Sequence, residues 1–333
     1  MRIALALLPV LLFIGLLQLM DSFKLVRLRS VLQSIAIGGV AALLAAFLNR
    51  ALLDGLGLDL RTYSRYVAPV LEELMKAAWV ILAIRRQRVG FLVDAAILGF
   101  AVGAGFALVE NIDYLRQLPS SGWSLWFARG CGTAILHGAT TATVAVLAKN
   151  AYDRRPGILA FLPGLLVAVA IHSLFNHFVM PPLLSALILL ATLPPAFVFV
   201  FDRSEKTTRA WLGSEFDGEM AMLHRIVSGE VAGTRTGAYL EGLKEHFPGE
   251  VVADMLCLLQ IHIELSLRAK GILMARQAGI DLTIGEDGVA NVKELAYLEG
   301  QIGRTGLLAM KPILSLGSRE LWKIRMLQDT ATP

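Results

Sequence analysis

Three charged side chains interrupt an apolar stretch between Tyr66 and Arg86, which has the sequence YVAPVLEELMKAAWVILAIRR. They are Glu72, Glu73 and Lys76. At bilayer depth a charge costs about 2.5–3.5 kcal/mol even on the mildest scale, so such residues usually face a polar interior and mark a function. On a helix Lys76 shares a face with Glu72 and is also close to Glu73, while the two glutamates point about 100° apart. An ion pair within the helix gives Lys76 and one carboxylate a partner. We therefore expect a group from elsewhere in the chain to contact the other carboxylate.

Four side chains suited to the same chemistry lie in later apolar stretches: Glu110, His137, His172 and Asn176. Histidines and carboxylates are zinc ligands, and a catalytic zinc keeps three protein ligands and a water. A divalent metal such as zinc, held by Glu110, His137 and His172 with Glu72 or Glu73 as the base, satisfies that count. A metal-free site in which a Glu–His pair activates water uses the same residues. Both alternatives predict hydrolytic chemistry.

Each of these residues also has a purely structural interpretation. Glu110 lies near the end of its stretch, where a side chain can reach the membrane interface. His137 fits a neutral core histidine bonded to a carbonyl or to Thr141. His172 and Asn176 are four residues apart and fit an interhelical hydrogen-bond pair. In the catalytic interpretation, an Asn beside a His can donate a hydrogen bond to an oxyanion, which is the role we predict for Asn176.

Composition places the chain among integral membrane proteins. Of its 333 residues, 56% are hydrophobic and 17% are charged, against about 45–50% and about 25% in soluble domains. Residues 1–201 contain 16 Lys and Arg against 9 Asp and Glu. Because this basic excess lies beside the apolar stretches, it predicts membrane orientation and no nucleic-acid partner.

We predict an all-α, polytopic membrane helix bundle of about seven spans in residues 1–201, followed by a C-terminal helical cytoplasmic domain in residues 202–333. The predicted spans are Ile3–Met20, Val31–Leu53, Tyr66–Arg86, Gly90–Leu115, Trp126–Ala148, Gly157–Val179 and Pro182–Phe201, the last of them interrupted by Pro194 and Pro195. The first span resembles a signal peptide but lacks a small-residue cleavage site, so we retain it as a span. Basic clusters follow the first, third and fifth spans, which predicts an N-terminus outside the cell and a cytoplasmic C-terminal domain.

This topology puts the polar residues at one level of the membrane. At 1.5 Å per residue, Glu72, Glu73, Glu110, His137 and His172 all fall within roughly 7–17 Å of the outer surface. Polar groups this numerous at one depth indicate a wet, enclosed cavity in the outer half of the bilayer.

Four motifs follow one another on successive predicted spans: EELMK (Glu72–Lys76), GFALVENIDY (Gly105–Tyr114), the run from Arg129 to His137 and Gly138, and IHSLFN (Ile171–Asn176). Together they resemble the PrsW family of intramembrane proteases, which is related to the CAAX-prenyl-protease and bacteriocin-processing membrane proteins. The resemblance covers about residues 60–180. It implies a multi-pass protease of the bacterial cytoplasmic membrane that cuts membrane-anchored proteins, such as an anti-sigma factor, near the outer face. It also implies catalytic or metal-binding roles for Glu72, Glu73, Glu110, His137 and His172.

The tail, residues 202–333, is charged and rich in polar turns. Apolar positions at helical spacing predict helices over Val251–Gln277, Val289–Thr305 and Arg319–Gln328. His262 and Glu264 on the first of these are interpreted as ordinary core or surface residues. We expect a small helical domain that regulates the membrane part, binds a cytoplasmic partner or forms a homo-oligomer.

Two classes of function stay open. The first is an intramembrane endopeptidase that hydrolyses membrane-anchored protein substrates among membrane lipids, with Glu and His activating water. The second is a membrane receptor, scaffold or transport protein that uses the same polar layer to bind a ligand or an ion. A degenerate protease usually loses a Glu or His from the set, and the complete set here favours the first class.

Overall fold

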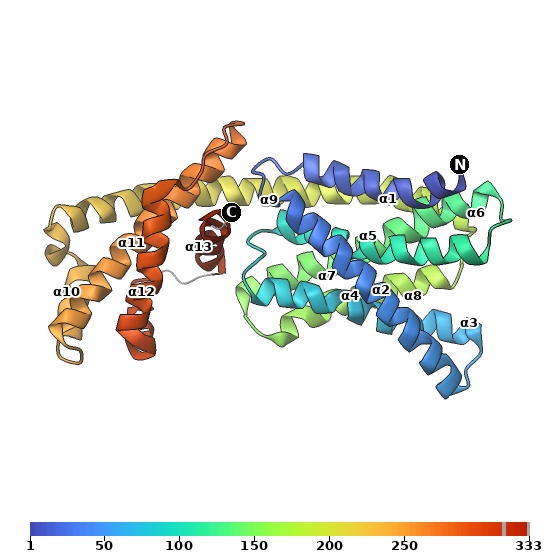
Figure 1. The fold of residues 1–333 in the computed structure, drawn as a ribbon, viewed down its shortest axis with the longest axis horizontal. Helices are drawn as coiled ribbons and strands as arrows, with labels where there is room; N and C mark the ends of the chain where they lie inside the picture. The colour runs from blue at the N-terminus through green and yellow to red at the C-terminus, as the bar shows by residue number, and fades with distance from the viewer. Residues whose placement is uncertain (315–317, 332–333) are drawn as a thin grey trace. The chain divides into compact units, whose positions relative to one another are not determined.

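The computed structural model describes residues 1–314 and 318–331, which form helices without any strand (Figure 1). The chain divides into two compact units, Met1–Glu205 and Lys206–Pro333. The predicted all-α, polytopic helix bundle is thus confirmed.

The helices of the first unit follow the predicted spans closely. They are α1 (Arg2–Leu19), α2 (Leu28–Leu56), α3 (Leu60–Thr62), the π-helix η1 (Tyr63–Val67), α4 (Ala68–Arg85), α5 (Leu92–Gln117), α6 (Trp123–Phe127), the π-helix η2 (Ala128–Thr133), α7 (Ala134–Arg154), the 3-10 helix η3 (Ile158–Phe161), α8 (Leu162–Asn176) and α9 (Pro182–Val227). Within the described residues, six helical stretches are long and apolar enough to cross a membrane: Arg2–Leu19, Leu28–Leu56, Leu92–Gln117, Trp123–Arg154, Ile158–Asn176 and Pro182–Val227. The chain is therefore a multi-pass membrane protein.

The helix α4 is the one predicted span that is not among these six. Its 18 residues include Glu72, Glu73, Lys76 and Arg85. These charges keep its apolar character below that of the other long helices in the first unit. The predicted count of seven spans is therefore not confirmed.

The last predicted span differs from the structure at two points. The helix α9 continues through Pro194 and Pro195, where we predicted an interruption, and it ends at Val227 instead of Phe201. Proline is tolerated inside membrane helices. Beyond Phe201 the chain becomes charged but retains good helix formers, so the loss of apolar character does not end the helix.

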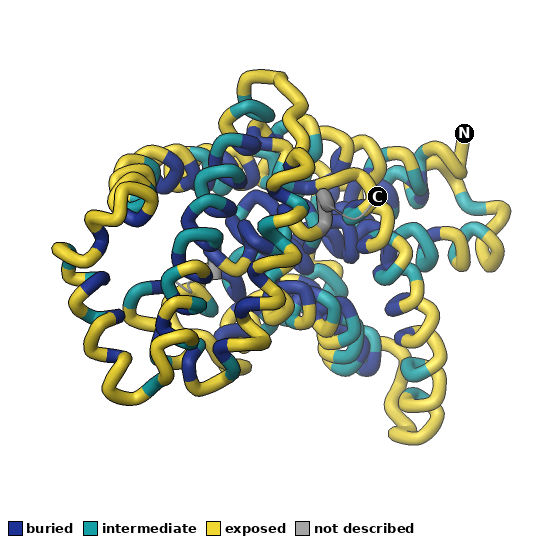
Figure 2. The backbone as a smooth tube through the Cα atoms, turned by 60° about the vertical axis from the view of Figure 1, so that its left-hand side comes forward, coloured by how far each residue is buried: buried dark blue, intermediate teal, exposed yellow. Residues whose placement is uncertain are grey.

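The centre of the first unit is formed by α5 and α7, which lie side by side (Figure 1). In their most apolar segments 78% of the residues are buried, against 33% or less in the other four stretches. Figure 2 shows which parts of the backbone are buried and which are exposed. Glycines permit the close approach of helices, as is common in membranes. A Cβ atom on Gly103 of α5 would lie 2.0 Å from the carbonyl oxygen of His137 on α7.

The second unit is built around α11. Besides the end of α9, it contains the 3-10 helix η4 (Glu230–Gly233), α10 (Arg235–Leu243), α11 (Gly249–Gln277), α12 (Gly285–Met310) and α13 (Ser318–Ala331). Both α12 and α13 pack against α11. The helix predicted over Val251–Gln277 corresponds to α11, and its buried apolar side chains form the largest part of the core of this unit.

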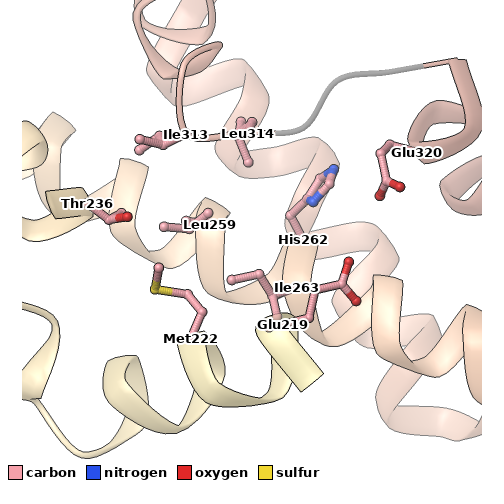
Figure 3. Close-up of a pocket in the computed structure, with 10 residues that line it drawn as sticks. Glu219, Met222, Thr236, Leu259, His262, Ile263, Ile313, Leu314 and Glu320 are labelled. Atoms are coloured by element: carbon pink, nitrogen blue, oxygen red, sulfur yellow. The ribbon is translucent and has the colours of Figure 1, made fainter. Parts of the chain in front are cut away.

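Buried charges accompany that core. The carboxylate of Glu219 lies 3.0 Å from Nζ of Lys270 and 3.6 Å from Nζ of Lys323, and both lysine side chains are fully buried. Beside Glu219 is a cavity of about 150 Å³ that His262 and Glu320 also line (Figure 3). His262 is therefore a largely buried residue, and its Nε2 has no hydrogen-bond partner among the described residues.

Acid is expected to weaken the second unit through His262. Burial, reinforced by the nearby Lys323, lowers the pKa of this imidazole from 6.5 to about 4. Between these two values the unfolded chain binds a proton that the folded unit does not, so the stability of the unit falls as the pH falls. We expect the opening free energy of α11 amides, measured by hydrogen exchange, to drop by about 2 kcal/mol between pH 7 and pH 5.

The matched control is a histidine outside the core. His262→Phe is expected to remove most of the drop, whereas the same change at the exposed His246 leaves it in place. An equal drop in wild type and His262→Phe would contradict this assignment.

Candidate functional site

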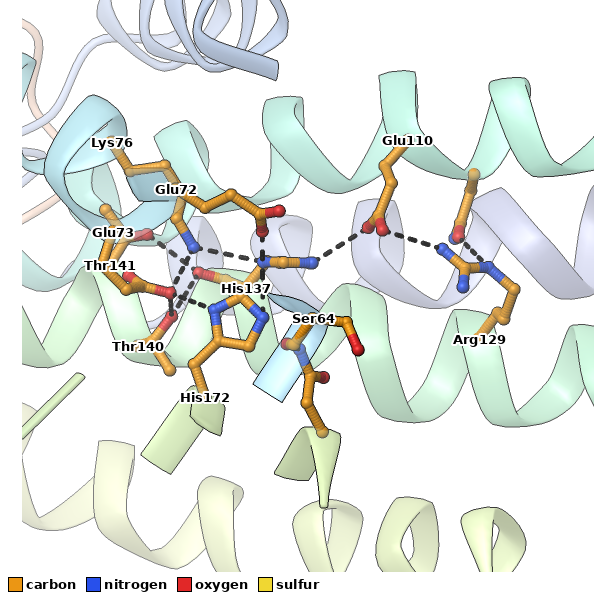
Figure 4. A network of polar contacts seen from close by, with 12 residues as sticks. Ser64, Glu72, Glu73, Lys76, Glu110, Arg129, His137, Thr140, Thr141 and His172 are labelled. Atoms are coloured by element: carbon orange, nitrogen blue, oxygen red, sulfur yellow. Dashed lines mark hydrogen bonds and ion pairs between the residues drawn. The ribbon is translucent and has the colours of Figure 1, made fainter. Parts of the chain in front are cut away.

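Five of the six predicted site residues meet in one polar cluster of the first unit (Figure 4). Glu72 and Glu73 come from α4, Glu110 from α5, His137 from α7 and His172 from α8. Residues that are up to 100 positions apart in the sequence thus share one network.

Glu73 is the most connected carboxylate of this cluster. Its Oε1 accepts hydrogen bonds from Nζ of Lys76 at 2.6 Å, from Nδ1 of His172 at 2.8 Å and from Oγ1 of Thr140 at 3.1 Å. Its Oε2 is buried and has no hydrogen-bond partner among the described residues. The ion pair on α4 therefore joins Lys76 to Glu73, and side chains of α7 and α8 meet the same carboxylate.

His137 lies between two charged groups. Its Nδ1 is 3.1 Å from Nζ of Lys76, and its Nε2 is 3.0 Å from Oε2 of Glu110. The ring of His172 stands edge-on to it, with the ring centres 4.9 Å apart. The backbone carbonyl of His137 accepts a hydrogen bond from Oγ1 of Thr141 at 2.9 Å.

Glu72 is held from two sides. Its Oε1 accepts a hydrogen bond from Nδ2 of Asn49 on α2 at 3.1 Å, and its Oε2 lies 3.8 Å from Nε2 of His172. Among the described residues, one group of three potential ligands could hold a metal ion, and it consists of Glu72, His137 and His172. The ligand atoms of this group all lie within 4.8 Å of one another.

This group differs in one member from the metal ligands that we predicted. Glu110 lies on the other side of His137, at the ring nitrogen that faces away from Glu72 and His172 (Figure 4). Glu72 takes its place in the group. Our prediction placed both glutamates in the same layer of the membrane, and the packing of α4 against α8 decides between them.

The donor set fits a divalent metal. Two imidazoles and a carboxylate are the ligands found in catalytic zinc sites. Nδ1 of His172 is bonded to Glu73, which leaves Nε2 facing Glu72, and a carboxylate behind a ligating histidine is the usual support of a metal site. Glu110 supports His137 from behind in the same way.

Glu110 is also the most exposed of the three glutamates in the network. The exposed fraction of its side chain is 28%, against 14% for Glu72 and 0% for Glu73. Its carboxylate lies 3.4 Å from the guanidinium of Arg129, which donates to Oδ1 of Asn111 at 2.9 Å. The carboxylates of Glu110 and Glu72 are therefore more accessible than that of Glu73.

The structure does not bring Asn176 into this network. Its Nδ2 donates to the carbonyl of Ser64 at 2.9 Å, and Oγ of Ser173 donates to the carbonyl of Arg65 at 2.6 Å. Both carbonyls belong to the π-helix η1, and a second π-helix, η2, carries Arg129. Such segments often occur at functional sites. These bonds join α8 to the segment before α4, and the oxyanion role of Asn176 stays a prediction.

Three polar contacts were not anticipated from the sequence. Asn49 holds Glu72, Thr140 holds Glu73 and Arg129 holds Glu110. Thr140 lies three residues after His137, on the same face of α7, so helical spacing carried a signal for this contact.

A comparison with protein-family models finds one match, described as PrsW family intramembrane metalloprotease, over residues 27–201. The matched region includes every residue of the polar cluster and covers more than half of the chain. No curated protein and no solved structure matches the chain significantly.

Proposed function

Because the chain belongs to the PrsW family of intramembrane metalloproteases, we propose that it is an endopeptidase that hydrolyses membrane-anchored protein substrates in a polar cavity in the outer half of the bilayer. The observation that carries this proposal is the group of Glu72, His137 and His172, which three helices bring together with a second carboxylate behind each histidine. The basic clusters after the first, third and fifth predicted spans support an N-terminus outside a bacterial cytoplasmic membrane.

We assign Glu72, His137 and His172 as the residues that hold a divalent metal, with zinc as the ion that best suits two imidazoles and a carboxylate. Such an ion polarises a carbonyl oxygen and lets a bound water lose its proton near neutral pH. The remaining carboxylates of the cluster orient this set.

Glu73 acts as the positioning residue for His172. Because its Oε1 accepts from Nδ1 of His172 at 2.8 Å, the other ring nitrogen is left with its lone pair toward Glu72. Thr140 and Lys76 fix the same carboxylate oxygen. A fully buried side chain with three such bonds holds its geometry and has no surface with which to touch a substrate.

Glu110 acts as the positioning residue for His137. Its Oε2 lies 3.0 Å from Nε2 of His137, the ring nitrogen that faces away from Glu72 and His172, and Arg129 lies 3.4 Å from its other oxygen. Because Glu110 is on the far side of His137 from the proposed metal group, its part in the chemistry is to fix the tautomer and the orientation of this imidazole.

The second unit has no part in this chemistry. We propose that residues 202–333 form a cytoplasmic helical domain that regulates the protease, docks a cytoplasmic partner or joins two copies of the chain. Its own core and buried ion pairs support a separately organised unit.

Metal removal tests the proposed function directly. A purified, full-length protein in lipid nanodiscs is incubated with a single-span substrate before and after dialysis against a strong chelator. We expect the chelator to lower the cleavage rate at least about 100-fold, because the water loses its activating ion. Addition of Zn²⁺ is expected to restore it.

Two other outcomes would change the proposal in different ways. Undiminished cleavage by a protein without metal would support the metal-free site in which a Glu–His pair activates water. Stable metal binding without cleavage of any single-span substrate would contradict the protease and support a receptor, scaffold or transport protein.

A further inference from the structure

Lys76 contacts the ring nitrogen of His137 through which this histidine would bind a metal ion. Nζ of Lys76 lies 3.1 Å from Nδ1 of His137. An ammonium group can only donate hydrogen bonds, so Nδ1 must be the acceptor and Nε2 must carry the proton that goes to Glu110. Figure 4 shows the nitrogen bonded to Lys76 on the side of Glu72 and His172, and the nitrogen bonded to Glu110 pointing away from them.

A metal ion and Lys76 therefore compete for one lone pair. A histidine binds metal through a deprotonated ring nitrogen, and here the nitrogen on the side of the other two ligands already accepts a proton from Lys76. A metal ion and the ammonium group of Lys76 would also repel each other, because both are positively charged. The ammonium is fully buried and lies 5.1 Å from the centre of the Phe106 ring, so it is part of the packed site and not a mobile surface group.

The structure also provides a place to which Lys76 can withdraw. Oε1 of Glu73 accepts three hydrogen bonds, one of them from Lys76, while the buried Oε2 of the same carboxylate has no partner among the described residues. A move of Nζ from Nδ1 of His137 toward this oxygen keeps the ion pair and frees the imidazole. A buried acceptor without a partner gains a hydrogen bond in the process.

We propose that Lys76 is a built-in competitor of the metal, holding Nδ1 of His137 in the metal-free site and withdrawing to the free oxygen of Glu73 when the ion binds. This inference rests on the metal-holding part of the proposed function. It makes Lys76 a positioning residue that limits metal affinity, so that the ion must displace an internal cation before the site is complete.

The test is the affinity of the full-length protein for Zn²⁺ and Co²⁺, measured in nanodiscs by competition with a chromophoric chelator. Lys76→Met removes the competing ammonium and nearly preserves the side-chain volume. We expect Zn²⁺ to bind this variant at least tenfold more tightly than wild type. Lys149→Met is the matched control, because Lys149 is also fully buried in α7 but pairs with Asp153 outside the cluster; its affinity is expected to equal that of wild type.

A second pair of variants distinguishes competition by Lys76 from the effect of the negative charge on Glu73. Lys76→Met also leaves the Glu73 carboxylate without its counter-ion, which by itself attracts a cation. We therefore compare Glu73→Gln with the double variant Glu73→Gln/Lys76→Met, and expect the same tenfold tightening in that background. Tightening that disappears when Glu73 is neutral would overturn the proposal. Lys76→Gln replaces Lys76→Met if the latter does not give a folded protein on size-exclusion chromatography.

The failures of the two proposals are distinguishable. Metal binding by wild type that is unchanged or weaker in the lysine variants overturns the role of Lys76 and leaves the metalloprotease intact. Absence of metal binding in wild type and in every variant overturns the competition together with the metal ligands. Cleavage of a single-span substrate, measured separately, then decides whether proteolysis itself stands.

Discussion

Replacing His172 by Ala is expected to abolish cleavage of a co-expressed single-span substrate while the protein level stays unchanged. His172 links the two carboxylates of α4, since its Nδ1 lies 2.8 Å from Glu73 and its Nε2 lies 3.8 Å from Glu72. Its loss removes a proposed ligand and leaves the buried Glu73 without one of its three donors. Loss of a supporting group alone typically lowers activity or metal affinity about 10–100-fold, so we expect a reduction of at least about 100-fold when a ligand is removed.

The control histidine lies at the end of the same helix. His177 bonds to the carbonyl of Ser173 and to the hydroxyl of Tyr66, outside the cluster. His177→Ala is expected to retain most of the cleavage, measured as the ratio of fragment to intact substrate on an immunoblot. Cleavage by His172→Ala at the wild-type rate would show that the cluster is not the active site.

The sequence was informative about which residues meet, because charged groups in apolar helices need polar partners. Helical geometry places Lys76 within reach of both Glu72 and Glu73, and the structure forms the ion pair with Glu73, at 2.6 Å. Membrane depth added the prediction that residues on different helices share a level. The structure brings these residues into contact, Glu110 with His137 and Glu73 with His172.

Contacts that depend on the rotation of helices about their axes could not be predicted in this way. Depth gives one coordinate for each residue, and it placed both Glu72 and Glu110 in the same layer as the two histidines. The choice of Glu72 for the metal group depends on how α4 faces α8, and the hydrogen bond from Asn49 depends on how α2 faces α4. Neither rotation can be predicted from a single sequence, because all these helices are apolar on most sides.

The limits of hydropathy appear at the two elements where our predictions differ from the structure. The charges that mark α4 as functional are the same charges that remove it from the set of apolar spans. At α9 the apolar character ends near Phe201, but the helix extends to Val227 because Glu, Lys, Arg and Ala maintain helical propensity. Hydropathy indicates whether a segment lies in lipid or in water, but it does not indicate where its helix ends.

Replacing Gly103 by Ala is expected to disable the site without changing any of its side chains. A Cβ atom at this position would lie 2.0 Å from the carbonyl oxygen of His137 and 2.7 Å from Cα of Gly138. Both are backbone atoms, so no side-chain rotation relieves the overlap, and α5 and α7 must separate by about 1 Å to restore normal contacts. Glu110 on α5 then moves away from His137 on α7, and a misplacement of about 1 Å lowers an enzymatic rate about 100-fold.

The helix α1 provides the matched control for this substitution. Gly15 has no heavy atom within 4 Å of an added Cβ, and Ala is a better helix former than Gly. We therefore expect Gly15→Ala to cleave substrate at the wild-type rate, and Gly103→Ala to lose at least about 100-fold in rate or to be degraded in the membrane. Both are measured by the cleavage assay together with protein level. Wild-type cleavage by Gly103→Ala would contradict the contact between α5 and α7 at His137, and with it the geometry that brings the two halves of the cluster together.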